Sequence, residues 1–145
     1  MKVGTVLPIT QDALLIRTES ENEDAWKAIC DLIRQPVHDG PHIFHAHVEF
    51  LDDPHFRSIT VEELLARVPS DYPHSFLMAV DKAATQSPEF PVLVIDLYYD
   101  RGRTFRAVPT AIQGIENNLS IANMGFYEFA DHVDEDGVFR EFRLS

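Results

Sequence analysis

Residues 76–97 read FLMAVDKAATQSPEFPVLVIDL, and this stretch decides the fold. It contains two short apolar runs, Phe76–Val80 and Val92–Leu97, and Asp96 is the one charged residue in them. Strands that are apolar on both faces are typical of the middle of a sheet that is covered on both sides. We therefore predict that these two runs are central strands.

Three more strands are expected on either side of this stretch. Ala13–Arg17 is a third apolar run. His42–Leu51 alternates between apolar and polar residues, which predicts a strand with one buried and one wetter face. Thr104–Val108 follows the turn Asp100–Gly102, where glycine supplies the positive φ, and we expect it to pair with Val92–Leu97 as an antiparallel hairpin.

Helices are expected between and after these strands. Ser20 with Glu23 forms one capping box, Thr60 with Glu63 forms a second, and the sequence after each has apolar residues at helical spacing. Two further helices are expected from Pro109 and around residues 126–133. The order β-α-β-α-β-β-β-α-α predicts an α/β fold, with α+β as the alternative, in a single globular domain over residues 1–145. We expect this domain to contain a mixed sheet of about five strands with about four helices packed on it.

The composition gives the molecule a strongly acidic character. The 145 residues include 24 Asp and Glu against 12 Lys and Arg, which gives a net charge of −12. Such a charge repels nucleic acid and anionic membrane surfaces. It favours a basic protein or peptide as the partner, or it serves solubility alone. No apolar run approaches the roughly 20 residues that span a bilayer.

Cys30 is the single cysteine, so an intramolecular disulfide is impossible. It lies in a helical apolar pattern, and we expect it to be a small buried hydrophobe. The chain has no signal-peptide pattern and no cysteine framework, which favours a cytoplasmic location. The sequence requires no cofactor.

The sequence His45-x-His47-x-Glu49 is the strongest candidate for chemistry. A period of two places all three side chains on one face of a strand. Two imidazoles and a carboxylate can bind zinc or iron, or act as an acid/base pair. The alternative is a solvent-facing strand whose polar side is rich in histidine.

A second candidate is the set of acids at the ends of the predicted strands: Asp52, Asp53, Asp81, Asp96 and Asp100. If the strands run parallel, these acids converge on one edge and can hold a magnesium ion or share a proton. Asp53 and Asp81 also suit local turns or helix caps. Asp96 interrupts an apolar strand, and we expect Arg106 or Arg103 to pair with it.

The C-terminal part carries the candidates for partner binding. Asp131, Asp134, Glu135 and Asp136 precede Gly137, but the ligand ladder of a calcium-binding EF-hand is missing. We expect this acidic segment to be a solvated helix end or a docking surface for a basic partner. Asn117 lies on the polar side of the preceding predicted helix and is a further contact candidate.

Three stretches, LPITQDALLIRT (residues 7–18), DYPHSFLMAVD (residues 71–81) and IENNLSIANMGFYEFADHVDEDGVFREF (residues 115–142), resemble an uncharacterised bacterial family, a domain of unknown function. The resemblance implies a small, acidic, stand-alone domain and transfers no activity. The chain departs from it at Gly125, where an aspartate is expected before the last helix.

Two functions fit these observations. The first is a non-catalytic acidic interaction module, similar to an inhibitor, immunity protein or regulator, that docks a basic partner. The alternative is a small enzyme that uses His45, His47 and Glu49 with a nearby aspartate. A homodimer through the sheet edge or the aromatic C-terminal helix is compatible with both functions.

Overall fold

The computed structural model describes residues 4–143, which contain eight strands, five α-helices and two 3-10 helices. The strands are β1 (Ala13–Arg17), β2 (Val37–Asp39), β3 (His42–Phe44), β4 (Val48–Leu51), β5 (Phe76–Val80), β6 (Val92–Asp96), β7 (Thr104–Ala107) and β8 (Val138–Phe139). The helices are α1 (Glu23–Arg34), η1 (Pro54–Phe56), α2 (Val61–Ala66), α3 (Lys82–Gln86), η2 (Pro109–Ala111), α4 (Ile112–Ser120) and α5 (Phe126–Ala130).

Six strands form one sheet in the order β4-β1-β5-β6-β7-β8, and β2 and β3 form a second sheet. β1 runs parallel to both β4 and β5, β5-β6-β7 is antiparallel, and β7-β8 is parallel. The prediction of an α/β fold with a mixed sheet is confirmed. The main sheet exceeds the expected five strands because Val138–Phe139 adds to its far side.

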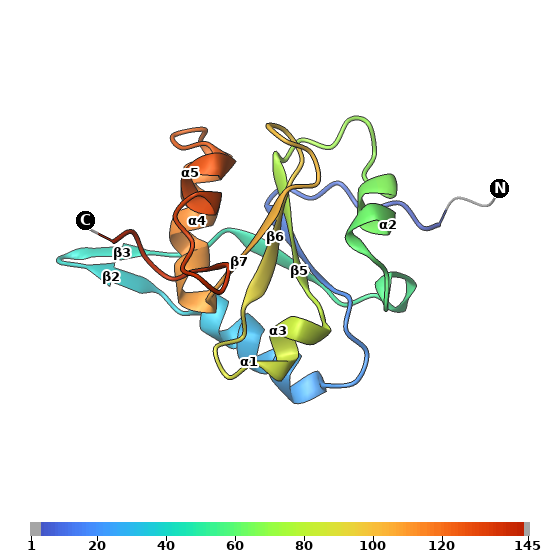
Figure 1. Cartoon of the computed structure of the whole chain (residues 1–145), viewed down its shortest axis with the longest axis horizontal. Helices are drawn as coiled ribbons and strands as arrows, with labels where there is room; N and C mark the ends of the chain where they lie inside the picture. The colour runs from blue at the N-terminus through green and yellow to red at the C-terminus, as the bar shows by residue number, and fades with distance from the viewer. Residues whose placement is uncertain (1–3, 144–145) are drawn as a thin grey trace.

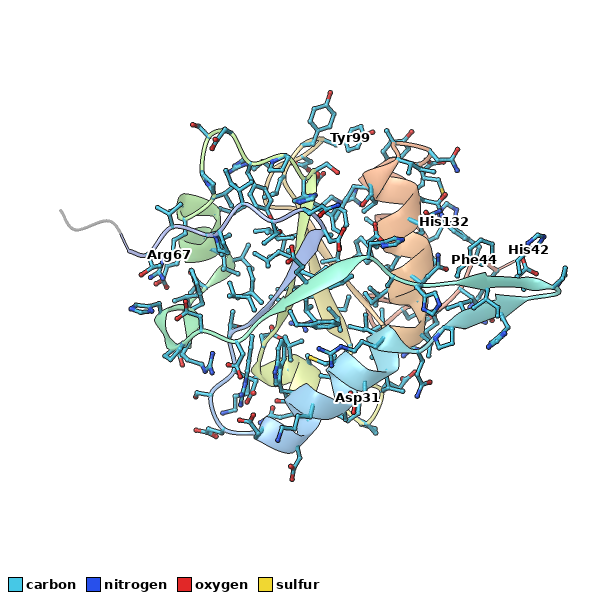
Figure 2. The ribbon with its side chains drawn as sticks, turned by 180° about the vertical axis from the view of Figure 1, so that it is seen from behind. Asp31, His42, Phe44, Arg67, Tyr99 and His132 are labelled. Atoms are coloured by element: carbon cyan, nitrogen blue, oxygen red, sulfur yellow. The ribbon has the colours of Figure 1, made fainter. Side chains whose placement is uncertain are left out.

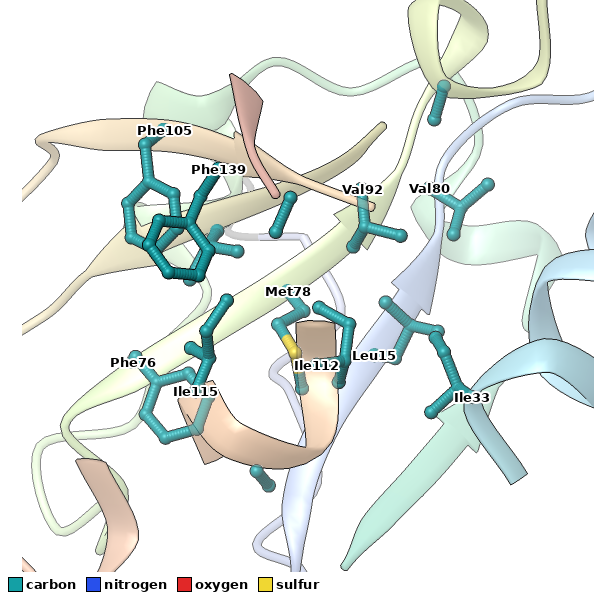
Figure 3. Packing of buried hydrophobic residues seen from close by; sticks show 14 of the residues in the cluster. Leu15, Ile33, Phe76, Met78, Val80, Val92, Phe105, Ile112, Ile115 and Phe139 are labelled. Atoms are coloured by element: carbon teal, nitrogen blue, oxygen red, sulfur yellow. The ribbon is translucent and has the colours of Figure 1, made fainter. Parts of the chain in front are cut away.

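The central strands are covered on both sides, as their apolar sequence predicts. One face of the sheet packs against α1, α4 and α5, and the other packs against α2, η1 and the N-terminal segment around Leu7. Figure 1 shows these layers on either side of the strands. Figure 3 shows the larger core, where Met78 of β5 lies close to Ile112 and Ile115 of α4. Cys30 is buried in this core, as expected, and burial raises the pKa of its thiol to about 12.

Local signals set most helix starts, with one correction. The capping box of Thr60 and Glu63 begins α2, and Asp81 caps α3 through the Ala84 amide. The predicted capping box of Ser20 and Glu23 is wrong. Asn22 caps α1 instead, by accepting a hydrogen bond from the Ala25 amide.

The predicted strand His42–Leu51 is wrong in part, because residues 45–47 interrupt it. Its first part, β3, pairs with β2 in a hairpin that turns at Gly40, whose φ is +59°. We call this hairpin (residues 37–44) the arm, and Figure 1 shows it projecting from the body. Phe44 was expected to be buried, but it is exposed on the arm. Of the helices in residues 4–143, none is long and apolar enough to cross a membrane.

Candidate functional site

His45 and Glu49 lie in the same hollow of the structure, but His47 does not line it. His45 and Glu49 line a hollow of about 420 Å³ beside β4, together with Arg34 and Phe50. The Glu49 carboxylate accepts a long hydrogen bond from the Asp12 amide at 3.4 Å. Within residues 4–143, no three His, Cys, Asp or Glu side chains are grouped to hold a metal ion. The three residues of the metal hypothesis are therefore not brought together into one site.

Glu116 of α4 anchors the interrupted segment and was not singled out from the sequence. Its carboxylate is 3% exposed and accepts hydrogen bonds from the His47 amide at 2.7 Å and the Ser120 hydroxyl at 2.6 Å. Glu116 lies one turn after Ile112 on the inward face of the helix. An acid on an apolar helix face is the signal that identifies it, because a buried carboxylate needs donors.

Asp96 is buried, but the expected arginine partner is wrong. Arg106 pairs with Asp81, and Arg103 pairs with Asp131. The Asp96 carboxylate instead accepts hydrogen bonds from three backbone amides of the following turn, Tyr98 at 2.9 Å, Tyr99 at 3.1 Å and Asp100 at 2.8 Å. Asp96 therefore shapes the loop that leads to β7.

The acids at the strand ends do not converge on one edge. Because β6 is antiparallel to β5, Asp96 and Asp100 lie at the opposite end of the sheet from Asp52 and Asp81. Asp53 caps η1 by accepting a hydrogen bond from the His55 amide, which is the local role that the sequence offered as the alternative. The convergence of these acids required parallel strands and does not occur, whereas the local cap roles allowed for Asp53 and Asp81 are confirmed.

Arg17 and Glu19 occupy the carboxyl end of β1 and were missed in the sequence. Their side chains are 4% and 3% exposed and lie 2.6 Å apart. Arg17 also contacts Glu23 at 3.0 Å and Asp52 at 3.3 Å, and Asp52 in turn pairs with Arg57. The signal in the sequence is an arginine that ends an apolar strand, with a glutamate two residues later, because a buried charge must find a partner.

The electrostatics of Glu19 follow from this packing. Burial acts to raise the pKa of its carboxyl group, but hydrogen bonds from the Asn22 and Glu21 amides and from Arg17 outweigh it. The pKa of Glu19 therefore lies below its ordinary value. A hollow of about 600 Å³ lies beside Glu19 and includes Ser58, Lys82 and Thr85. None of His45, His47, Glu49 and Asp96 lines it.

The acidic C-terminal segment is largely neutralised by arginines of the same chain. Arg140 contacts Asp134 at 2.8 Å, Asp136 at 2.7 Å and Glu89 at 2.8 Å. Arg143 also contacts Asp134, at 2.8 Å. Asp131 pairs with Arg103 at 2.5 Å, and Glu135 and Asn117 are exposed. A basic partner at this segment has to compete with internal arginines.

These ion pairs predict that acid destabilises the fold. Hydrogen bonds from Arg143 and Arg140 hold the pKa of Asp134 well below its ordinary value, and the pKa values of Glu19, Glu89 and Asp136 are also lowered. A lowered pKa gives stability above the unfolded-state pKa of about 4, and this stability is lost as the pH falls through the folded-state pKa. We expect the urea midpoint to be level from about pH 7 to 5 and to fall below about pH 4.5.

The variant Arg140→Gln is expected to make this decline shallower, because Glu89 and Asp136 lose their charged partner and Asp134 keeps only Arg143. Urea unfolding followed by circular dichroism over a pH series measures both effects. A midpoint that rises on acidification contradicts the assignment.

A cluster of exposed tyrosines lies at the opposite end of the sheet from Arg17. Tyr98, Tyr99 and Tyr127 are 73%, 52% and 50% exposed. The rings of Tyr98 and Tyr99 lie 4.9 Å apart, and those of Tyr99 and Tyr127 lie 5.9 Å apart, both edge to face. Figure 2 shows Tyr99 at the outer end of the molecule. The ring of Tyr127 lies in the space next to Gly125 that a side chain at this position would enter.

Two hollows adjoin this cluster, and we call them together with the three tyrosines the tyrosine groove. One hollow, about 330 Å³, includes Tyr99 and Ser120, and the other, about 430 Å³, includes Tyr72 and Arg101. Both are lined by Pro73, His74, Ser75 and Tyr98. The hydroxyl of Tyr72 is buried with no hydrogen-bond partner in residues 4–143, and burial raises its pKa to about 12. The sequence analysis did not single out this surface, although the two adjacent tyrosines after an apolar strand are a signal that points to it.

A search of the curated proteins finds no relative of this chain. A family model described as "Domain of unknown function (DUF6924)" matches residues 12–142, which is most of the sequence. This range contains β1 through β8, most of the core and the tyrosine groove. The resemblance to an uncharacterised family is thereby confirmed, and the chain belongs to the family described as Domain of unknown function (DUF6924).

Proposed function

We propose that the protein is an acidic interaction module that binds a basic segment of another protein in the tyrosine groove, in the manner of an inhibitor, immunity protein or regulator. The observation that carries the proposal is the set of three exposed tyrosines in mutual contact beside two hollows. Tyrosine is enriched at the centres of protein interfaces because it offers a large rigid surface with a polar tip.

The charge of the chain favours a cationic occupant. The net charge is −12, and Asp71 and Asp100 near the groove have no ion-pair partner within residues 4–143. Lysine and arginine side chains bind over tyrosine rings through cation–π attraction. Arg101 lies in the hollow that also includes Tyr72, where it donates to the carbonyls of Leu65 and Leu97. Because Arg101 repels other cations, we place the cationic side chains of the partner in the other hollow, which includes Tyr99 and Ser120.

The groove also suits docking better than the acidic C-terminal segment. The carboxylates of Asp131, Asp134 and Asp136 already pair with arginines of this chain, whereas Tyr98, Tyr99 and Tyr127 are half or more exposed. We further propose a cytoplasmic location. Cys30 is buried and unpaired, which suits a reducing compartment.

Binding of a fluorescent nona-arginine peptide, followed by anisotropy, tests the charge requirement. We expect binding that weakens by more than about tenfold between about 50 and 300 mM salt, because exposed charges are screened. A nona-glutamate peptide is the control and is expected not to bind. Binding of nona-arginine that does not respond to salt contradicts the proposal.

Substitution of the tyrosines tests the location. The double variant Tyr98→Ser/Tyr99→Ser is expected to weaken nona-arginine binding by about tenfold, since it removes two interface anchors without touching the core. The matched control is Glu62→Gln on α2, an exposed acid on another side, which is expected to change the affinity by less than about twofold. Equal effects of the two variants mean that the peptide binds diffusely and that the groove is not the site.

The enzymatic alternative keeps one supporting observation, the hollow that contains both His45 and Glu49. It predicts that zinc binds to untagged protein and that His45→Ala abolishes this binding. Isothermal titration with zinc measures it, and a titration without heat removes the metal form of the alternative.

A further inference from the structure

The loops that follow β1 and β5 enclose the hollow of about 600 Å³ beside Glu19, which we call the β1–β5 hollow. Its lining comes from residues 18–22 after β1, residues 58–59, and residues 81–83, 85 and 86 after β5. These two strands are parallel neighbours in the sheet order β4-β1-β5-β6. The chain leaves β1 through α1 toward β4, and it leaves β5 through α3 toward β6, on the opposite side.

This arrangement of connections is a general place for ligands in α/β sheets. Where two neighbouring parallel strands send their connections to opposite sides, the loops diverge and leave a crevice outside the carboxyl ends of the strands. Figure 1 shows α1 and α3, into which the two loops lead, at the same end of the sheet. The β1–β5 hollow therefore lies where the topology alone places a ligand site.

Hydrogen bonds hold the walls of the hollow in place. The Val80 carbonyl accepts a hydrogen bond from the Thr18 amide at 2.9 Å, which joins the two loops at their base. The Thr18 carbonyl accepts one from the Ser58 amide at 2.7 Å. The buried Glu19 carboxylate binds two amides of its own loop, and Asp81 caps α3 on the other wall. Walls that are fixed before a ligand arrives reduce the entropy that binding costs.

The lining of the hollow is polar and mostly uncharged. A volume of about 600 Å³ suits a small molecule, but pockets for such molecules are usually lined mainly by apolar side chains. Six of the twelve lining residues here are instead uncharged and polar: Thr18, Ser20, Asn22, Ser58, Thr85 and Gln86. Within residues 4–143, the side chains of Ser20, Ser58 and Gln86 make no hydrogen bond to the protein, so they are available to a polar ligand.

The charges around the hollow balance each other. Two of the lining carboxylates, those of Glu19 and Asp81, each pair with an arginine of the same chain. The remaining charged residues of the lining are one anion, Glu21, and one cation, Lys82, both exposed. A phosphate group is repelled by the field of a chain with a net charge of −12, and a single lysine does not offset that field. The hollow therefore suits an uncharged ligand.

We propose that the β1–β5 hollow binds a neutral, hydroxyl-rich small molecule, in the chemical class of the mono- and disaccharides. Sugar hydroxyls both donate and accept hydrogen bonds, and the hydroxyls and side-chain amides of the lining do the same. Ile59 and Ala83 add a small apolar surface for the C–H face of a sugar ring. The hollow lies at the opposite end of the sheet from the tyrosine groove, so it stands independently of the proposed binding function.

Amide-resolved NMR of the labelled full chain tests the site with four probes, glucose, galactose, N-acetylglucosamine and maltose, each up to about 100 mM. We expect at least one of them to shift the amides of Ser20, Ser58 and Thr85 in a saturable manner and to leave those of Tyr98 and Tyr99 unmoved. Glycerol over the same range is the control for general solvation by hydroxyl groups and is expected to cause no saturable shift. Four probes without a saturable shift at these amides overturn the proposal, and so do equal shifts by glycerol and by every sugar.

Substitution of one residue on each wall tests the location. Ser20→Ala/Gln86→Ala removes a hydroxyl after β1 and an amide after β5, and it is expected to weaken the binding of the sugar with the largest shifts by about tenfold. The matched control Gln35→Ala/Ser70→Ala makes the same two changes at exposed positions that do not line the hollow, and it is expected to change the affinity by less than about twofold. All four positions are exposed, and the amide spectrum shows whether each variant is folded. Equal affinities of the two double variants place the sugar outside the hollow and overturn the proposal.

Discussion

Replacing Arg17 with methionine is expected to lower the free energy of unfolding by about 3–5 kcal/mol, the usual loss when one partner of a buried ion pair is removed. The Arg17 side chain is 4% exposed and contacts Glu19, Glu23 and Asp52. Without the guanidinium, Glu19 stays buried with its charge, and Asp52 loses one of its two arginines. The variant also removes the ion pairs that connect the end of β1 with Asp52, after β4, and with Glu23, at the start of α1.

Urea unfolding at about pH 7 measures this loss, and Arg34→Met is the matched control. Arg34 is exposed and its pair with Asp31 is 3.6 Å long, so we expect a change within about 1 kcal/mol. Adding Glu19→Gln to Arg17→Met is expected to recover part of the stability, because the neutral amide oxygen still accepts from the Glu21 and Asn22 amides. Equal, small losses for Arg17→Met and Arg34→Met contradict the assignment of Arg17 as the centre of this network.

Replacing Asp96 with alanine is expected to lower the free energy of unfolding by about 2–4 kcal/mol, because three backbone amides lose a charged acceptor. The carboxylate is 1% exposed and receives hydrogen bonds from Tyr98, Tyr99 and Asp100. The same bonds fix the backbone that carries two of the three groove tyrosines. We therefore expect Asp96→Ala to weaken nona-arginine binding as well.

Asp96→Asn separates these effects, since the amide oxygen keeps part of the acceptor capacity, and its loss is expected to be smaller, about 1–2 kcal/mol. The neighbouring Asp100→Asn is the control, because Asp100 is exposed and its carboxylate receives none of the turn amides. Thermal or urea unfolding of the three variants gives the ranking. An Asp96→Ala variant as stable as Asp100→Asn contradicts a structural role for Asp96.

The two central strands of the sheet could be predicted from the sequence, because the signals that define them lie within a few residues. Phe76–Val80 and Val92–Leu97 are apolar on both faces, and a strand of that kind has few places in a fold other than the covered centre of a sheet. The caps at Thr60 and Asp81 and the glycine turn at Gly102 depend on neighbours within a few residues. These signals therefore survive without knowledge of the tertiary structure.

Apart from the cap of α1, the failures come from contacts that are distant in sequence. The alternation of His42–Leu51 continues through the segment around His47, but Glu116 on α4 binds the His47 amide and the strand breaks there. Arg106 stands opposite Leu93 rather than beside Asp96, and it bonds to Asp81 across the sheet. Partner choice among several arginines depends on strand register, which the sequence does not reveal.

The same contrast between local signals and distant contacts applies to the candidate sites. Acidity of the C-terminal segment is visible in the sequence, but its neutralisation by Arg140 and Arg143 is a property of the folded chain. The tyrosine groove combines residues from four separate segments, around His74, Tyr99, Ser120 and Tyr127. Single residues of the groove are visible in the sequence, whereas their assembly is not.

The central claim is that a basic segment docks in the tyrosine groove, and amide-resolved NMR of the labelled full chain with nona-arginine tests it most directly. The account predicts that the amides of Ser75, Tyr98, Tyr99 and Ser120 shift in a saturable manner, while those of Asp134, Glu135 and Asp136 move little. Shifts concentrated on the acidic C-terminal segment, with the groove amides unmoved, would contradict it.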